Sequence, residues 1–402
     1  MAAILQPAGR SAPAGLMRPL DRTVAWIAGA LLVLAALYAG NVVSAKNGAL
    51  VLVGALLGVS LYHAAFGFTG GWRAFVQEGR GASLRAQLLL LALASVLLVP
   101  LIAQGDVLGR PVNGFVVPLS IPLLVGAFTF GLGMQLGGGC GSGTLFTAGG
   151  GSARMLVTLL AFIAGSVVGV AHMPAWAGLP AMDGVALWQE IGVVPALAVT
   201  LAVLGGLAWY VARSERRRTG RLAPLGALPG KAPRLLTGPW PLLWGAIALA
   251  LLSLLTLLVA GHPWGITGAF ALWGAKALVA VGVDVGSWQA WSGAGARAQL
   301  DGSLFAHPIS AMDIGLILGA MLAAGLAGKF APKVDLSLGS LAAAVVGGLL
   351  MGYGARLSSG CNIGALLGGI ASGSLHGWVW FALAFLGSLA GIRLRPLFRL
   401  QG

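Results

Sequence analysis

Cys140 and Cys361 are the only two cysteines among 402 residues, and each lies inside a copy of the same glycine-rich phrase. The copies read GLGMQLGGGCGSGTL from Gly131 and GYGARLSSGCNIGAL from Gly352. At a constant offset of 221 residues, seven of the fifteen positions are identical, both cysteines included. A duplicated segment that keeps the only thiols predicts one site built where the two copies meet.

The residues around each thiol favour the start of a short helix. Gly139, Gly141 and Gly360 flank the cysteines, and glycine allows a sharp turn and close approach of a ligand. The apolar stretch that follows each thiol is too brief to cross a bilayer. Backbone N–H groups at a helix start attract anions without a formal charge, and a thiol adds a soft, polarizable donor. This pattern predicts a site for a sulfur-bearing anion, although cysteine also serves as a small apolar packing residue.

Other polar residues are candidates because they adjoin the thiols or occupy matching positions in the copies. Ser142 and Asn362 can cap the short helices or contact the ligand. Gln135 and Arg356 each lie five residues before a cysteine, where they either line the site or face the membrane interface. Intramembrane ionisable groups such as His63 and Lys276 are functional candidates by default.

Composition identifies the class of protein. The chain is 58% hydrophobic and 8% charged, with a mean hydropathy of +0.93. We predict an all-α polytopic membrane protein of about ten transmembrane helices. The expected helices lie near 24–40, 48–66, 86–104, 119–136, 155–173, 193–212, 241–260, 311–328, 339–356 and 377–392. Tryptophans such as Trp72, Trp264 and Trp380 are expected in belts at the membrane interfaces.

Basic residues set the expected orientation. The net charge is +14, and the loop at 213–234 carries seven Lys or Arg residues, whereas 174–192 carries none. The positive-inside rule places the loop at 213–234 in the cytoplasm, together with both chain termini. Basic residues in loops between apolar runs favour contact with anionic lipid headgroups over nucleic-acid binding. The apolar run after Thr23 then serves as the insertion signal, since no cleavable signal precedes it.

This topology divides the chain into two membrane halves of opposite direction. We predict a cytoplasmic segment at 1–23, a first half at 24–212 with Cys140, a basic linker at 213–240 and an inverted second half at 241–402 with Cys361. Transporters with inverted repeats place their substrate near the bilayer midplane. A second, shorter repeat has the pattern Gly-x-Thr-Gly and occurs once in each half, with Thr69 in the first copy and Thr267 in the second. It predicts two further half-helices. Either threonine lines the path or bonds back to its own helix.

Several kinds of site are excluded by the motifs. The triple glycines lack the G-x-x-x-x-G-K-[ST] pattern of a phosphate loop. Two cysteines and five histidines do not assemble into a zinc cluster or a hydrolase triad. We therefore expect no catalytic residue, no metal site and no cofactor. No dense carboxylate relay or ATPase motif is evident, which favours downhill passage.

At GGGCGSG, SSGCNIG, GFTGGWRAF and HPWGITGAFALWG the chain resembles the YeeE/YedE sulphur transport family, over roughly residues 48–392. The resemblance implies a bacterial inner-membrane permease in which the thiols of Cys140 and Cys361 hydrogen-bond thiosulfate along a narrow path. It also implies a small cytoplasmic sulfur-carrier protein as partner. The family often has a further cysteine in a Phe-Cys-Phe-Thr-Gly phrase, where this chain has Gly67.

The leading hypothesis is thus a transporter or facilitator for a small sulfur-containing anion, thiosulfate first, and not an enzyme. One alternative is a membrane sulfurtransferase that relays persulfide sulfur to a carrier. Another is a channel or exporter for a different small inorganic anion, in which the cysteines only pack.

Overall fold

Apolar helices dominate the computed structural model, which describes residues 20–228, 232–330, 332 and 336–400. Within those residues, ten helices are long and apolar enough to cross a membrane. The long helices of these spans are α1 (Arg22–Tyr38), α2 (Ala45–Ala64), α4 (Ala82–Gln104), α5 (Ile121–Gly137), α7 (Ala153–Trp176), α9 (Val193–Thr219), α10 (Leu242–Ala260), α13 (Pro308–Leu326), α14 (Leu338–Leu357) and α16 (Leu375–Leu394). The predicted all-α polytopic membrane fold is confirmed.

Shorter elements fill the connections between these helices. The short α-helices are α3 (Phe68–Glu78), α6 (Gly141–Gly149), α8 (Leu187–Ile191), α11 (Thr267–Ala280), α12 (Ala294–Asp301) and α15 (Gly369–Ala371). Two segments are π-helical, η1 (Ala39–Val43) and η4 (Asn362–Gly368), and three are 3₁₀-helical, η2 (Gln289–Trp291), η3 (Leu304–Ala306) and η5 (Arg395–Phe398). Two small antiparallel pairs join β1 (Asp106–Val107) to β2 (Arg110–Pro111) and β3 (Leu119–Ser120) to β4 (Ala181–Met182).

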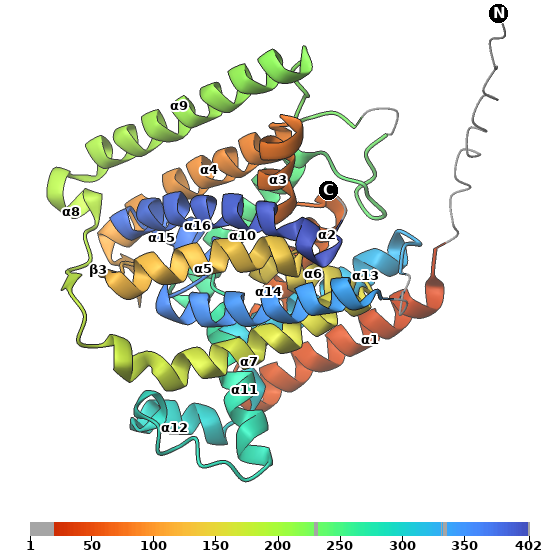
Figure 1. The fold of residues 1–402 in the computed structure, drawn as a ribbon. Coiled ribbons are helices and arrows are strands. Elements are labelled where there is room, and N and C mark those ends of the chain that lie inside the picture. Colours follow the sequence, from red (N-terminus) through yellow and green to blue (C-terminus); the bar gives the residue numbers. More distant parts are fainter. Residues whose placement is uncertain (1–19, 229–231, 331, 333–335, 401–402) are drawn as a thin grey trace, which may run out of the picture.

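The helices pack in a bundle in which α9 lies along the top edge of the view and α1 lies at the outer edge on the lower right (Figure 1). α1 packs on α13, and α9 packs on α4. Both outer helices expose large apolar side chains, such as Leu34 (62% exposed) and Val194 (77% exposed). Such side chains suit contact with lipid, because the bilayer core is apolar.

Close packing at the centre depends on the duplicated glycines of α5 and α14. A Cβ built on Gly133 would lie 2.8 Å from the carbonyl oxygen of Gly347, and one built on Gly354 would lie 2.6 Å from that of Gly126. These two contacts are reciprocal, because Gly126 and Gly133 match Gly347 and Gly354 at the offset of 221. Only residues without a side chain let the two backbones approach this closely.

The helix α9 extends further than the expected span at 193–212. It continues to Thr219, with Arg216, Arg217 and Arg218 in its last turn, so the beginning of the predicted basic segment is helical. Cations at a helix C-terminus interact favourably with the helix dipole, which explains the extension. Residues 229–231 of the linker and 1–19 of the N-terminal segment lie outside the described residues.

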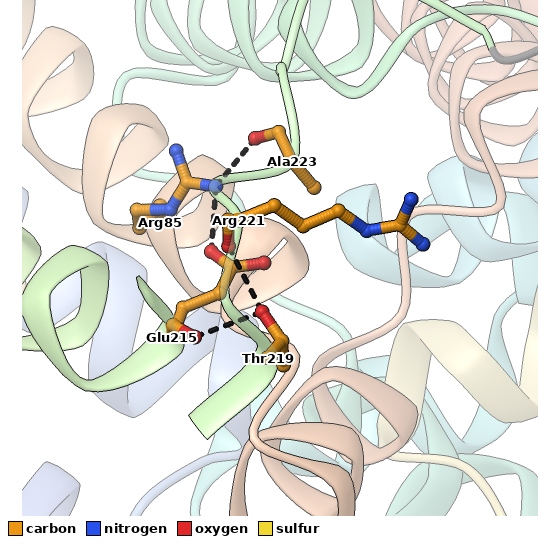
Figure 2. Close-up of polar contacts among 5 residues, drawn as sticks. All are labelled: Arg85, Glu215, Thr219, Arg221 and Ala223. Carbon is orange, nitrogen blue, oxygen red and sulfur yellow. Dashed lines mark hydrogen bonds and ion pairs between the residues drawn. The ribbon is translucent and has the colours of Figure 1, made fainter. Parts of the chain in front are cut away.

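A buried ion pair ties this end of α9 to α4 (Figure 2). Arg85 donates a 2.8 Å hydrogen bond to the Glu215 carboxylate and a 2.6 Å bond to the Ala223 carbonyl. The Thr219 hydroxyl donates to the carbonyls of Glu215 and Arg221, which closes the end of the helix. The side chains of Arg85 and Glu215 are only 11% and 2% exposed. The pair thereby fixes both α9 and the start of the linker.

We expect Glu215→Ala to destabilise the protein by about 3–5 kcal/mol, because it leaves the Arg85 charge buried and unpaired. The matched control is Glu78→Ala, which removes an exposed pair with Arg80 and is expected to cost less than about 1 kcal/mol. Thermal unfolding of the detergent-purified variants, followed by tryptophan fluorescence, measures the difference. Equal melting temperatures for the two variants would show that the buried pair is dispensable.

Candidate functional site

Cys140 and Cys361 occupy the same structural position, the residue just before a short helix. Cys140 is the N-cap of α6 and Cys361 is the N-cap of η4. The carbonyl of Cys140 accepts a 2.8 Å bond from Thr144 N, and that of Cys361 accepts a 2.9 Å bond from Ala365 N. Thr144 and Ala365 are themselves related by the offset of 221. The duplicated phrase therefore folds the same way twice at its cysteines.

The preceding glycines are required by these turns. A Cβ on Gly139 would lie 3.0 Å from Thr144 N, and one on Gly360 would lie 2.6 Å from Ala365 N. The amide that closes the first turn of each short helix thus leaves no room for a side chain at this position. The expectation that Ser142 or Asn362 caps the helices is wrong, because each lies beyond the N-cap cysteine.

The two thiols are buried where the copies meet. Cys140 is 1% exposed and Cys361 is fully buried. A Cβ on Gly141, the residue after Cys140, would lie 3.0 Å from Cys361 Sγ. Cys140 Sγ lies 3.4 Å from the Ser142 hydroxyl, and Cys361 Sγ accepts a 3.4 Å bond from Ile363 N. The two cysteine segments, 221 residues apart, are in direct contact.

The starts of α3 and α11 converge on the same place. The backbone at Phe68, the first residue of α3, faces the Cys140 sulfur. The side chain of Ile266, the N-cap of α11, would lie 3.5 Å from a Cβ on Gly141. Four short helices thus begin around the two thiols. Their N-terminal amides and dipoles give this region a positive potential without an added charge.

Gln135 and Arg356 make matching contacts with the Gly-x-Thr-Gly segments. Gln135 Nε2 donates to the Thr69 carbonyl at 3.2 Å and to the Ser388 hydroxyl at 2.6 Å. Arg356 donates to the Thr267 carbonyl at 3.0 Å and contacts its hydroxyl at 3.4 Å. In the described residues, Thr69 Oγ1 has no partner and the contact of Thr267 Oγ1 is with Arg356, so neither hydroxyl bonds back to its own helix. Gln135 therefore joins the long helix α5 to the short helix α3, and Arg356 joins the long helix α14 to the short helix α11.

Within the described part of the chain, several buried polar atoms near the thiols lack a hydrogen-bond partner, which is uncommon in protein interiors. They are Oγ1 of Thr69 and Thr144, Oε1 of Gln135, and both amide atoms of Asn362. Sequence reasoning missed Thr144, although it lies in the duplicated phrase four residues after Cys140. It also missed Asp313, a fully buried carboxylate inside α13 whose two oxygens are unpartnered. An acidic residue within an otherwise apolar predicted helix was the signal available.

A histidine lies against the start of α11 on the Arg356 side of the site. His307 is the N-cap of α13, where its Nδ1 accepts a 3.2 Å bond from Ser310 N. Its ring would lie 3.8 Å from a Cβ on Gly268 in the first turn of α11. Burial lowers the pKa of His307 to about 4, with the charges of His262 and Arg356 adding to the effect. At neutral pH the imidazole is uncharged, so Arg356 supplies the positive charge here.

Other predicted candidates have structural roles. Lys276 donates to the carbonyls of Leu300 and Gly302, so it fastens α12 to α11. His63 is buried against Trp240, with ring centroids 5.6 Å apart.

The expectation of interfacial belts is wrong for Trp72, Trp264 and Trp380, which are all buried. Trp72 donates to the Gln87 side chain and Trp380 to the Ser358 hydroxyl, so these polar ends are satisfied inside the bundle.

Gly67 precedes α3 as its N-cap, and a Cβ there would meet no atom within 4 Å. The space beside this position is therefore open. The first carbon of a cysteine side chain, as in the Phe-Cys-Phe-Thr-Gly motif, would fit there without displacing a neighbour.

Comparison with known proteins gives one family and several relatives. The family model described as sulphur transport matches residues 63–390. A probable transporter YedE from Escherichia coli is 32% identical over 163 residues, and the match covers 40% of each chain. A thiosulfate transporter TsuA from the same organism is 25% identical over 346 residues, covering 84% of this chain and 91% of the relative. The TsuA of Spirochaeta thermophila is 26% identical over 351 residues, covering 84% and 96%.

Proposed function

Because the chain belongs to the sulphur transport family, we propose that it carries a small sulfur-containing anion, thiosulfate first, across the bacterial inner membrane. Two of its relatives are named thiosulfate transporters, and they align over most of their length. The match to the YedE relatives spans about two fifths of those chains, so it supports the family assignment and carries no argument about the substrate.

The observation that carries the proposal is the meeting of two buried thiols at the starts of four short helices. The anion lies between Cys140 and Cys361, where backbone N–H groups and the two S–H groups donate to its oxygens and its terminal sulfur. Ser142, Asn362 and Thr69, which are all buried, supply further polar atoms. Thiols are weak donors, so the anion is held loosely enough to leave again.

Both thiols are shielded from solvent, so the structure represents a closed state of the path. Transport then requires that the short helices move relative to the long ones. The contacts of Gln135 with Thr69 and of Arg356 with Thr267 join these elements and are the bonds that such a movement breaks. We assign these four residues, with Gly139, Gly141 and Gly360, to the path.

We further propose that the two membrane halves, 24–212 and 241–402, are related by a pseudo-two-fold axis in an inverted arrangement. The reciprocal glycine contacts of α5 and α14 support this, since a two-fold interface pairs each residue with the counterpart of its partner. Neighbouring helices agree, because α14 packs on α7 while α5 packs on α16. The basic linker and both termini then face the cytoplasm, where a small sulfur-carrier protein receives the sulfur.

Uptake of labelled thiosulfate into proteoliposomes tests the function. We expect saturable uptake above that of empty vesicles, inhibited by unlabelled thiosulfate and much less by sulfate, chloride or fluoride. Sulfate is the informative competitor, because it has a similar charge and shape but no terminal sulfur. Uptake equal to that of empty vesicles would refute the transport function, and equal inhibition by all four anions would indicate a channel without sulfur selectivity.

A further inference from the structure

Asp313 is a buried ionisable group that the proposed path leaves unused. It lies one and a half turns into α13, its side chain is fully buried, and neither carboxylate oxygen has a hydrogen-bond partner among the residues that the structure describes. The contrast with Glu215 is clear, because that other buried carboxylate is paired with Arg85. Asp313 is thus a carboxyl group held inside the bundle without a compensating charge.

The packing of α13 places Asp313 toward the cysteine segments. Gly149 at the end of α6 contacts Ile317 and Ala320 of α13. Asp313 precedes these residues by four and seven positions, so all three share one face of the helix. α13 packs against α6, and α6 in turn contacts η4. The carboxyl group therefore belongs to the surroundings of the thiols.

Charged and titratable groups on the neighbouring elements do not neutralise it. α13 packs on α1, α2, α6, α11 and η3. The groups on those elements are Arg22, Tyr38, Lys46, Tyr62, His63 and Lys276. Lys46 is engaged with the carbonyl of Ala260, and Lys276 with carbonyls of the α12 region. An ionised carboxylate without a partner is too costly to keep in such a place, so the neutral acid is the form that fits this closed state.

We propose that Asp313 carries a proton that accompanies the anion through the membrane. The inference rests on the proposed transport function and adds its energy coupling. Asp313 takes a proton from external water on one carboxylate oxygen, stays neutral while the anion is bound beside it, and releases the proton to cytoplasmic water as the anion leaves. An ionised Asp313 would repel the bound anion, which is why the two events are linked.

Coupling to a proton lowers the net negative charge that crosses the membrane with each anion. Thiosulfate carries two negative charges, and an inside-negative membrane potential opposes their entry. One proton moving with each anion removes one of these charges. With the potential clamped at zero, one proton per anion predicts about a tenfold accumulation for each unit of inward pH gradient.

The experiment compares three proteins in proteoliposomes at clamped potential. With an acidic exterior, we expect the parent and Asp313→Glu to accumulate thiosulfate, because both keep a titratable carboxyl group. Asp313→Asn, which mimics the neutral acid permanently, should only equilibrate it. Exchange of internal for external thiosulfate needs no net proton movement, so it should persist in Asp313→Asn and shows that this variant is folded.

A pH-sensitive dye trapped inside vesicles of the parent gives a test that needs no variant. Adding thiosulfate outside, without a pH gradient, should acidify the lumen. Accumulation by Asp313→Asn equal to the parent, or thiosulfate uptake by the parent with no acidification, would overturn the proposal. Absence of thiosulfate exchange by the parent would instead refute the transport function itself.

Discussion

Replacing Cys140 or Cys361 with alanine is expected to lower the rate of thiosulfate uptake by roughly 10- to 100-fold, because hydrogen bonds to a charged group contribute about 1.5–3 kcal/mol each. Each thiol is buried at the start of a short helix, so no neighbouring side chain or water readily replaces it. Initial rates of labelled uptake into proteoliposomes, normalised to reconstituted protein, measure the loss.

Serine at the same positions is the matched control. A hydroxyl keeps a hydrogen-bond donor but removes the soft sulfur, so Cys140→Ser and Cys361→Ser should transport better than the alanine variants and discriminate less against sulfate. Melting temperatures close to the parent value show that the variants are folded. Alanine variants with parental rates would mean that the cysteines only pack among the glycines, which is the alternative that the sequence leaves open.

Gly141→Ala is expected to have the second large effect. The new Cβ would lie 3.0 Å from Cys361 Sγ, closer than the usual contact distance of about 3.5–4 Å. Overpacking at such a site costs about 1–3 kcal/mol, so we expect uptake to fall roughly tenfold or more, with Gly141→Val below Gly141→Ala. Gly141 is the first residue of α6, where alanine suits the helical backbone, so the loss reflects the site and not the helix.

Gly364→Ala provides the control for that substitution. Gly364 lies three residues after Cys361, and a Cβ there would meet nothing within 4 Å. Uptake by this variant should stay within about twofold of the parent, because surface and open positions tolerate small changes. Equal losses in Gly141→Ala and Gly364→Ala would show that uptake is sensitive to any added methyl group and not to the contact between the cysteine segments.

The long helices could be predicted from the sequence because a bilayer requires about twenty apolar residues per span. All ten expected spans lie within a few residues of the helices in the structure, apart from the extension of α9 to Thr219. The hydropathy signal ends where Arg213 begins a basic run, whereas the helix continues, because arginines at its C-terminus stabilise it. Apolar length thus predicts a span better than it predicts where the helix ends.

Parts of the candidate site were also visible in the sequence. The duplication alone predicts that Cys140 and Cys361 belong together, and the short helices after them follow from the length of the apolar stretches. The role of these residues in transport stays a proposal. What the sequence did not reveal depends on tertiary contacts: the N-cap position of both cysteines, the burial of Trp72 and Trp380, and the unpartnered state of Asp313.

Electron density for a bound anion tests the central proposal most directly. We predict that a structure determined with thiosulfate, or with selenosulfate as its heavier analogue, shows one anion between Cys140 and Cys361, with its terminal atom against a thiol and its oxygens at the starts of the short helices. The density should disappear in the double alanine variant. Anion density elsewhere in the bundle, unchanged when both thiols are removed, would contradict a path between the two cysteines.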